Sequence, residues 1–233
     1  MRIVEQSVQL MEDVDVDGEV ILWKLEAACR TCYKSEGRNA ERDLVKRDAL
    51  IRNAIKSGHH SVLEHAAVTF RVITNRGVTH EWVRHRIGVA YSQESTRYCN
   101  YGNDKFGSEI TVIWPWYLGQ MPTQIRALIP GVAYPTSVFT AVAPAYVAWY
   151  EAMLAAETHY FNLLDLGRTA QEARGVLPND LKTELVCTMN LRALRHFFEL
   201  RCSTKAHPQI RALAAELKKT LQTLIPVVFE DLS

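Results

Sequence analysis

The stretch from Ala66 to Thr74, with the sequence AAVTFRVIT, is the clearest strand pattern in the chain. It is rich in β-branched residues, and apolar and polar side chains alternate from Val68 onward, which predicts a half-buried strand. Asn75 follows directly, and asparagine is a preferred cap at a helix N-terminus. We therefore expect a helix that starts after Asn75 and ends near Ile87, with Gly88 as its left-handed C-cap.

Outward from this stretch, three further segments have the composition of strands: Arg2 to Leu10, Glu109 to Ile113 and Leu181 to Met189. Apolar spacing predicts helices at Val20 to Cys32, Asn39 to Lys56, Ser137 to Leu166, Ala170 to Val176, Leu191 to Leu200 and His207 to Leu224. Pro144 is expected to kink the longest of them. Because βαβ alternation is not regular, the pattern predicts an α+β fold, with a mixed or antiparallel sheet packed with long helices in a single domain over residues 1–233.

The composition is that of an ordinary globular protein. Of 233 residues, 48% are hydrophobic and 23% are charged, so a substantial core can form without disulfide or metal cross-links. The 27 basic and 26 acidic residues give a net charge of +1, which argues against a general nucleic-acid or membrane-surface binder. The acidic N-terminal region fits no leader peptide, and the five cysteines are irregularly spaced, so we expect a cytoplasmic protein with reduced thiols. Cys29 and Cys32 are expected to be buried and unreactive on the apolar face of the first helix.

The segment from Ile110 to Tyr150 contains only one charged residue. Its part from Ala127 onward is long enough to span a bilayer, but three prolines interrupt it, so we expect it to be buried in protein and predict no membrane association. The region around Trp114, Trp116 and Tyr117 fits ordinary core, and it also fits a subunit interface or a wall on which a folate stacks.

Cationic and polar residues gather between Arg84 and Tyr98. Arg84-His85-Arg86 would fan over roughly 200° of a helix, so the two arginines would grip different parts of one large ligand; alternatively, they offset the negative end of the helix dipole. Ser92, Gln93, Ser95 and Thr96 beside Arg97 suit a monophosphate or a sugar, or form a polar surface turn. Upstream, Gly58 to His65 holds three histidines and Glu64, but the spacing matches no structural zinc site and we expect no metal.

Four blocks of the chain, taken together, resemble the flavin-dependent thymidylate synthases. The blocks are Gly58-His59 to Glu64-His65, Arg84-His85-Arg86 to Ser95-x-Arg97-Tyr98, Arg174 to Leu177-Pro178, and Asn190-Leu191-Arg192 to His196-Phe197-Phe198-Glu199-Leu200-Arg201. The resemblance implies that family's fold and a homotetramer with active sites between subunits. It also implies an enzyme that uses FAD, reduced by NADPH, to convert dUMP and methylenetetrahydrofolate to dTMP, with no nucleic-acid partner.

The resemblance also implies the residues of the site. FAD would contact His59, Ser61, Arg84, His85, Arg86, Gln93, Asn190, Leu191, Arg192 and His196. The nucleotide would contact Glu81, Trp82, Val83, Arg84, Gln93, Glu94, Ser95, Thr96, Arg97, Arg174 and Arg201. Arg201 would be the catalytic residue, because a guanidinium against the uracil stabilises negative charge on its oxygens and activates C5 without a cysteine adduct. Ser95 has no adjacent general base in the local sequence, so it is assigned to binding rather than nucleophilic attack.

Three features depart from the family pattern. Eight residues, Ile87 to Glu94, separate the Arg-His-Arg triplet from Ser95, where seven are usual, and Gly88 is suited to absorb the extra one. Glu81 stands where a glutamine is common, which puts a carboxylate near a nucleotide anion. Ala206-His207-Pro208-Gln209 replaces the usual Ala-Gln-Trp-Glu.

Two other classes of protein fit the same arginines. A nucleotide- or nucleic-acid-binding module would use them to bind phosphates without chemistry, and its affinity would fall steeply with salt. A structural oligomer without a ligand would pair them with Glu and Asp. The enzyme instead requires convergence of six arginines: Arg84, Arg86, Arg97, Arg174, Arg192 and Arg201.

Overall fold

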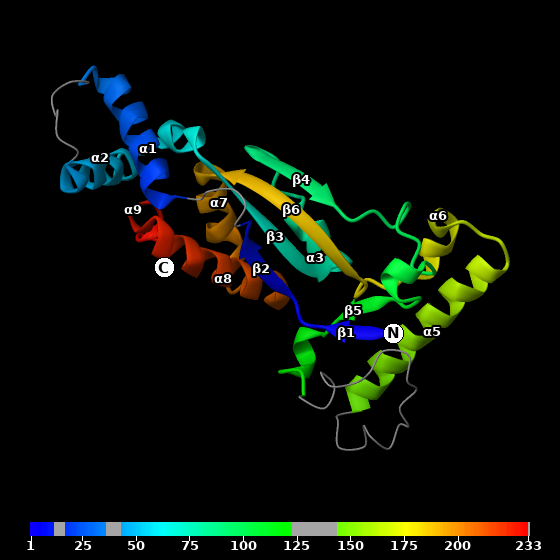
Figure 1. Cartoon of the computed structure of the whole chain (residues 1–233). Helices are drawn as coiled ribbons and strands as arrows, with labels where there is room; N and C mark the ends of the chain where they lie inside the picture. The colour runs from blue at the N-terminus through cyan, green and yellow to red at the C-terminus, as the bar shows by residue number, and fades with distance from the viewer. Residues whose placement is uncertain (12–16, 36–42, 123–143, 233) are drawn as a thin grey trace. The chain divides into compact units, whose positions relative to one another are not determined.

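The computed structural model describes residues 1–11, 17–35, 43–122 and 144–232 (Figure 1). Its strands are β1 (Arg2–Val4), β2 (Ser7–Leu10), β3 (Ala67–Asn75), β4 (Val89–Gln93), β5 (Thr111–Ile113) and β6 (Lys182–Asn190). Its α-helices are α1 (Gly18–Tyr33), α2 (Leu44–Lys56), α3 (Arg76–Trp82), α5 (Pro144–Asp165), α6 (Ala170–Ala173), α7 (Leu191–Arg201), α8 (Pro208–Leu224) and α9 (Pro226–Phe229). Short 3₁₀ helices are η1 (His60–His65), η2 (Asp104–Phe106), η3 (Trp116–Leu118) and η5 (Arg174–Val176).

Four strands form one sheet in the order β2-β3-β6-β4 (Figure 1). The main-chain hydrogen bonds that flank β6 and β4 run in the antiparallel sense: Asn190 N donates to Gly88 O, and Glu94 N donates to Glu184 O. β1 and β5 form a separate parallel pair, with Ile3 opposite Val112. The predicted α+β class, with an antiparallel main sheet, is therefore confirmed.

The chain divides into two compact units. The first unit comprises Met1–Ser7, Ile73–His80 and Gln93–Leu185. The second unit comprises Val8–Val72, Glu81–Ser92 and Val186–Ser233. The long strands β3 and β6 contribute residues to both, and the single catalytic domain expected from the sequence stays a prediction.

In the first unit, α5 is fixed by apolar packing and by directed hydrogen bonds. Trp149 is buried, and its ring meets the ring of Trp114, just after β5, edge to face at a centroid distance of 6.0 Å. Asp180 accepts hydrogen bonds from Trp149 Nε1 and from Asn75 Nδ2, both at 2.8 Å. One carboxylate thus joins α5 to the end of β3.

The core of the second unit contains a chain of aromatic rings that ends beside the predicted site. Phe229, Phe198, Phe197 and Trp82 are buried, and successive ring centroids along this series lie 5.5, 5.7 and 4.8 Å apart. His85 meets the Phe197 ring edge to face at 5.0 Å. Packing of α7 therefore sets the position of the Arg-His-Arg triplet.

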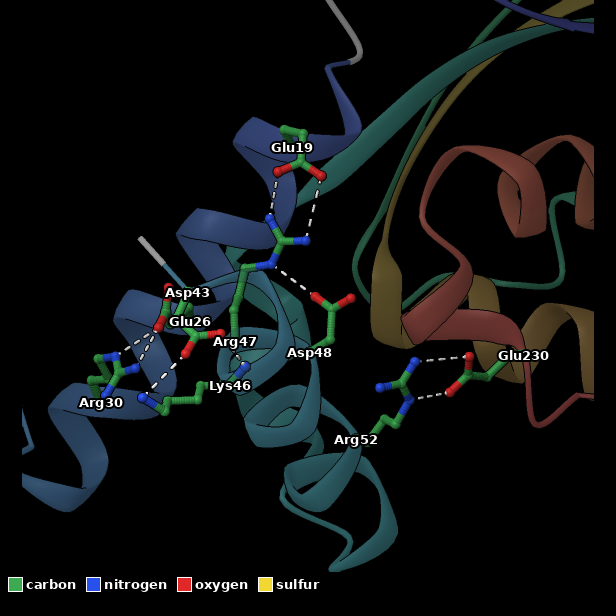
Figure 2. A network of polar contacts seen from close by, with 9 residues as sticks. All are labelled: Glu19, Glu26, Arg30, Asp43, Lys46, Arg47, Asp48, Arg52 and Glu230. Atoms are coloured by element: carbon green, nitrogen blue, oxygen red, sulfur yellow. Dashed lines mark hydrogen bonds and ion pairs between the residues drawn. The ribbon is translucent and has the colours of Figure 1, made fainter. Parts of the chain in front are cut away.

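A buried arginine connects α1 and α2 in the second unit (Figure 2). The Arg47 side chain is only 3% exposed, its Nη1 donates to Glu19 Oε2 at 2.6 Å, and its Nε donates to Asp48 Oδ1 at 2.8 Å. The guanidinium also lies 4.8 Å from the Trp23 ring centroid. Figure 2 also shows Arg52 pairing with Glu230, an ion pair that is half exposed on both sides.

Local signals placed most elements correctly, with four corrections. The segment Arg2 to Leu10 forms two strands, β1 and β2, that belong to different sheets. The helix after β3 ends at Trp82, not near Ile87, because the chain turns there and then forms β4, which the sequence did not predict. α9 is also an additional element. Residues 137–143 of the predicted long helix, and so its junction with Pro144, lie outside the described residues.

The thiol and membrane expectations have mixed outcomes. Cys29 is buried, and burial raises the pKa of its thiol to about 11, but Cys32 is exposed, so the expectation of a buried pair was wrong for Cys32. Most of the uncharged stretch 127–150 lies outside the described residues. Across the part of the chain that the structure describes, no helix is both long and apolar enough to cross a bilayer.

Candidate active site

The turn after α3 presents the Arg-His-Arg triplet in the second unit. Trp82 is fully buried, whereas the side chains of Arg84 and Arg86 are exposed on either side of the half-buried His85. The Tyr91 hydroxyl lies 2.9 Å from Trp82 O and 2.7 Å from His85 O, so its proton can be donated to either carbonyl. Tyr91, which lies in β4, therefore connects that strand to the turn by a hydrogen bond.

Arg201, at the end of α7, lies against this turn. Its Nη1 donates to Glu81 Oε2 at 2.8 Å, its Nη2 donates to Glu81 O at 3.0 Å, and its Nε donates to His85 Nε2 at 3.0 Å. The arginine side chain is 18% exposed, so it is reachable from solvent although three of its donors are occupied. The predicted catalytic arginine is thus joined directly to two residues of the predicted site.

His85 is held in its neutral form. Burial, followed by the charges of Arg201 and His196, lowers the pKa of His85 from 6.5 to about 4. Because Nε2 accepts the hydrogen bond from Arg201, the ring proton of neutral His85 lies on Nδ1.

Two adjoining clefts in the second unit collect several of the predicted cofactor residues. One has a volume of about 490 Å³ and is lined in part by Gly88, Asn190, Arg192 and His196. The other, of about 350 Å³, is lined in part by His59, Ser61 and Arg192. His60 and Arg192 line both clefts, so the structure brings five predicted contacts together: His59, Ser61, Asn190, Arg192 and His196.

Gly88 lines one of these clefts, and its backbone conformation explains why a glycine stands there. Its φ of +69° is in the left-handed region, although Gly88 does not cap α3, which ends at Trp82, and an added Cβ would clash with the Asn190 side chain. Asn190 in turn caps α7, because its Oδ1 accepts from Ala193 N at 2.8 Å. The glycine allows the triplet loop to approach the start of α7 closely.

The histidine-rich block contributes to the clefts rather than to a cluster of ligating groups. Glu64, which could have joined His60 around a metal, accepts a hydrogen bond from Arg192 Nη1 at 2.6 Å. In the described ranges, no group of three or more His, Cys, Asp or Glu side chains is arranged to hold a metal ion. Leu191 is fully buried, so its side chain faces the core and not a cleft.

The predicted nucleotide contacts from Gln93 to Arg97 belong to the first unit. Gln93 Nε2 donates to the buried hydroxyls of Thr79 and Thr183, at 3.0 and 3.3 Å. Glu94 Oε1 accepts from Tyr101 OH at 2.9 Å, and its Oε2 accepts from Lys182 Nζ at 3.2 Å. Both side chains are therefore anchored by protein partners, and Lys182 compensates the charge of Glu94.

Two of the predicted nucleotide contacts, Arg97 and Arg174, belong to the first unit. Arg97 Nε donates to Gln171 Oε1 of α6 at 2.7 Å, and Arg174 follows Gln171 by three helical residues, which places both on one face. Ser95 Oγ accepts from Arg97 N at 3.3 Å, as a residue shaping a binding turn does. Thr96 is buried.

The six arginines that the enzyme hypothesis requires to converge are divided between the two units. Arg97 and Arg174 belong to the first unit, and Arg84, Arg86, Arg192 and Arg201 belong to the second, where Arg192 lines both clefts and Arg201 contacts the turn. Arg192 pairs with Glu64 and Arg201 pairs with Glu81, which is the pairing that the structural-oligomer interpretation predicts for these two arginines. Trp114 is core as expected, while Trp116 and Tyr117 are 49% and 52% exposed.

Four supporting residues of these sites were not anticipated. Tyr91, Tyr101, Gln171 and Lys182 act through hydrogen bonds to residues of the predicted site. Tyr91 stands inside the motif between the triplet and Ser95, so its position was a usable signal. The other three have no such local signal.

Comparison with known proteins now identifies the family. Residues 23–227 match the family described as thymidylate synthase complementing protein. A flavin-dependent thymidylate synthase of Geobacter sulfurreducens is 35% identical over 208 residues, which cover 88% of this chain and 78% of the relative. One of Mycobacterium tuberculosis is 35% identical over 226 residues, covering 93% and 81%. The chain belongs to the flavin-dependent thymidylate synthase family.

A solved structure supports the same assignment. The UMP/dUMP methylase PolB from Streptomyces cacaoi, crystallised with 5-Br dUMP, has a TM-score of 0.72 to this chain at 27% sequence identity. The match covers 99% of this chain and 96% of that one.

The departures from the pattern of flavin-dependent thymidylate synthases have local structural explanations. Glu81 directs its carboxylate to Arg201. His207 caps α8 through Nδ1, which accepts from Gln209 N at 3.4 Å, and Pro208 is the first residue of that helix. The unusual tetrapeptide is therefore a helix start.

Proposed function

We propose that this protein is a flavin-dependent thymidylate synthase that methylates dUMP to dTMP, with methylenetetrahydrofolate as the one-carbon donor and FAD, reduced by NADPH, as the cofactor. The observation that carries the proposal is the arrangement of Arg201. Two of its five N–H groups have no protein acceptor within the described ranges, and the side chain is reachable from solvent. These donors are available to the oxygens of a pyrimidine.

The chemistry assigned to Arg201 follows from its charge. A guanidinium that donates to the uracil oxygens stabilises negative charge on the ring, and this makes C5 more nucleophilic. A cysteine nucleophile is then unnecessary; Cys29 and Cys187 are buried, whereas Cys32 is exposed. Burial raises the pKa of the Cys187 thiol to about 12, so this group stays protonated near neutral pH.

The residues around the two clefts fit a flavin cofactor. His59, Ser61, Asn190, Arg192 and His196 offer hydrogen-bonding groups and positive charge suited to an isoalloxazine ring and a pyrophosphate. FAD would supply the hydride that completes the methyl group. The task of the protein is to hold the reactants in order and exclude water.

Arg97, Arg174 and Ser95 suit the nucleotide phosphate. Their combination of two guanidinium groups and a hydroxyl is the donor set that a monophosphate requires. The remaining nucleotide and cofactor contacts of the sequence analysis belong to this proposal. So do the homotetramer with inter-subunit active sites, the preference for NADPH, and the cytoplasmic location.

The visible spectrum of the purified protein is the first test. We expect a bound flavin, bleaching of its band by NADPH under anaerobic conditions, and formation of dTMP when dUMP and methylenetetrahydrofolate are added. UMP is assayed in parallel, because the solved relative is a UMP/dUMP methylase. Since the named relatives are thymidylate synthases, we expect dUMP to be preferred.

A colourless protein that takes up no added FAD would contradict the proposal. Binding of nucleotides that weakens steeply with salt, without turnover, would then favour a phosphate-binding module. Turnover of UMP in preference to dUMP would change the assigned substrate but not the reaction.

A further inference from the structure

Glu81 supplies two of the three protein acceptors that fix Arg201. Its carboxylate Oε2 lies 2.8 Å from Nη1, and its main-chain oxygen lies 3.0 Å from Nη2. The third acceptor, His85 Nε2, lies 3.0 Å from Nε. Each of the three guanidinium nitrogens is thus held from a different point on one short turn.

Arg201 needs such partners because of its place in the chain. It is the last residue of α7, and an arginine side chain that lacks fixed partners samples many rotamers. A planar guanidinium held at three points keeps one orientation. Its two remaining N–H groups then always point in the same directions.

Direct contact between Glu81 and the nucleotide is the less consistent role. A carboxylate beside a phosphate or an ionised pyrimidine repels it. The structure instead turns the carboxylate toward Arg201, and the Glu81 side chain is 35% exposed. A glutamine at this position would keep an acceptor oxygen but carry no charge.

We propose that Glu81 is the positioning residue of Arg201: its carboxylate orients the guanidinium that activates the pyrimidine, and its negative charge weakens nucleotide binding. This inference rests on the proposed function. Because two guanidinium N–H groups stay available in the described structure, substrate binds without breaking the ion pair.

The substitutions E81Q and E81A separate the two effects. Both remove the negative charge, but only glutamine retains an oxygen that can accept from Arg201 Nη1. Glu230→Gln and Glu230→Ala are the matched controls, because Glu230 makes an equivalent arginine pair with Arg52 in the same unit and lies outside the predicted site. Steady-state turnover and dUMP binding by calorimetry are measured for the FAD-loaded proteins.

We expect kcat to fall by about tenfold or more in E81A, because misplacing a catalytic group by a fraction of an ångström is enough for such a loss. In E81Q the fall is expected to be about threefold or less, since the acceptor is kept. E81Q should bind dUMP several-fold more tightly, because it removes like charge and keeps Arg201 oriented. The Glu230 variants should match the unmodified protein.

Equal losses of kcat in E81Q and E81A, or no loss in E81A, would overturn the positioning role. Unmodified protein that does not turn over dUMP would instead refute the proposed function. In that case crystal structures of E81A and E81Q decide the inference: a displaced Arg201 only in E81A supports it, and an unmoved Arg201 in E81A overturns it.

Discussion

The Nε of Arg201 donates a hydrogen bond to Nε2 of His85 at 3.0 Å. This bond joins the predicted catalytic arginine to the centre of the Arg-His-Arg triplet, 116 residues away in sequence. It requires a lone pair on Nε2, which only the neutral imidazole offers. The charge state of His85 and the orientation of Arg201 are therefore coupled.

This coupling predicts a loss of stability in mild acid. The pKa of His85 is about 4 in the folded protein and about 6.5 in the unfolded chain, so between these values the unfolded state binds more protons. Stability then rises with pH, and this contribution is present above pH 6.5 and lost as the pH falls toward 4. We expect His85 to lower the free energy of unfolding by about 2 kcal/mol between pH 8 and pH 5.

Denaturant unfolding of the unmodified protein and of His85→Gln, at fixed protein concentration, measures this contribution. Glutamine offers an acceptor to Arg201 but does not titrate, so the variant should show a shallower pH dependence. Identical slopes would show that His85 does not titrate as described.

Replacement of Arg201 by alanine should abolish turnover. The side chain is partly exposed and its ion pair contributes little to stability, while its charge stabilises the activated pyrimidine. We expect kcat/KM to fall by about 10²-fold or more, with the circular dichroism spectrum unchanged. Turnover near that of the unmodified protein would remove Arg201 from the catalytic role.

Substitution of Gly88 by alanine should destabilise the site. The φ of +69° costs an alanine about 1 kcal/mol, and the new Cβ would also press against Asn190. Gly167→Ala is the control, because Gly167 has a φ of +79° with no atom within 4 Å of an added Cβ. The melting temperature and the amount of bound flavin should both fall more in G88A than in G167A. Equal decreases in the two variants would show that the close approach of Gly88 to Asn190 has no consequence.

Arg47, the buried arginine of Figure 2, should contribute far more to the free energy of unfolding than the half-exposed Arg52. Arg47→Met leaves Glu19 and Asp48 without their cation, and we expect a loss of about 2 kcal/mol. Arg52 is 51% exposed, so Arg52→Met should cost about 0.5 kcal/mol. Urea titration of both variants measures the difference, and similar values would mean that burial does not control the strength of these pairs.

Prediction of the fold succeeded where a local pattern decides the structure. The strand pattern at 66–74 and the Asn75 cap, whose Oδ1 accepts from Val78 N at 2.8 Å, correspond to β3 and α3. β4 was missed because it is a five-residue strand at the end of the sheet order, with no strictly buried residue. Such a strand forms through pairing with β6, and its own sequence carries little hydrophobic periodicity.

The family blocks named Arg201, Glu81 and His85 as candidate site residues, and the ligands assigned to them stay predictions. The contacts among these residues were not predicted. The pairing of Glu81 with Arg201 joins residues 120 positions apart, and no local pattern encodes such a distance. Partners such as Lys182 were missed for the same reason, since a charged residue on a strand is ordinarily solvated.

Each unit is assembled from three separate segments, with junctions after Ser7, Val72, His80, Ser92 and Leu185. No contiguous gene fragment therefore encodes either unit by itself. An exchange of one unit between two homologous genes would need crossovers at all five junctions, each of which falls inside a helix or strand: β2, β3, α3, β4 or β6. Genes with this layout are expected to diverge by point substitution along the whole chain rather than by trading modules.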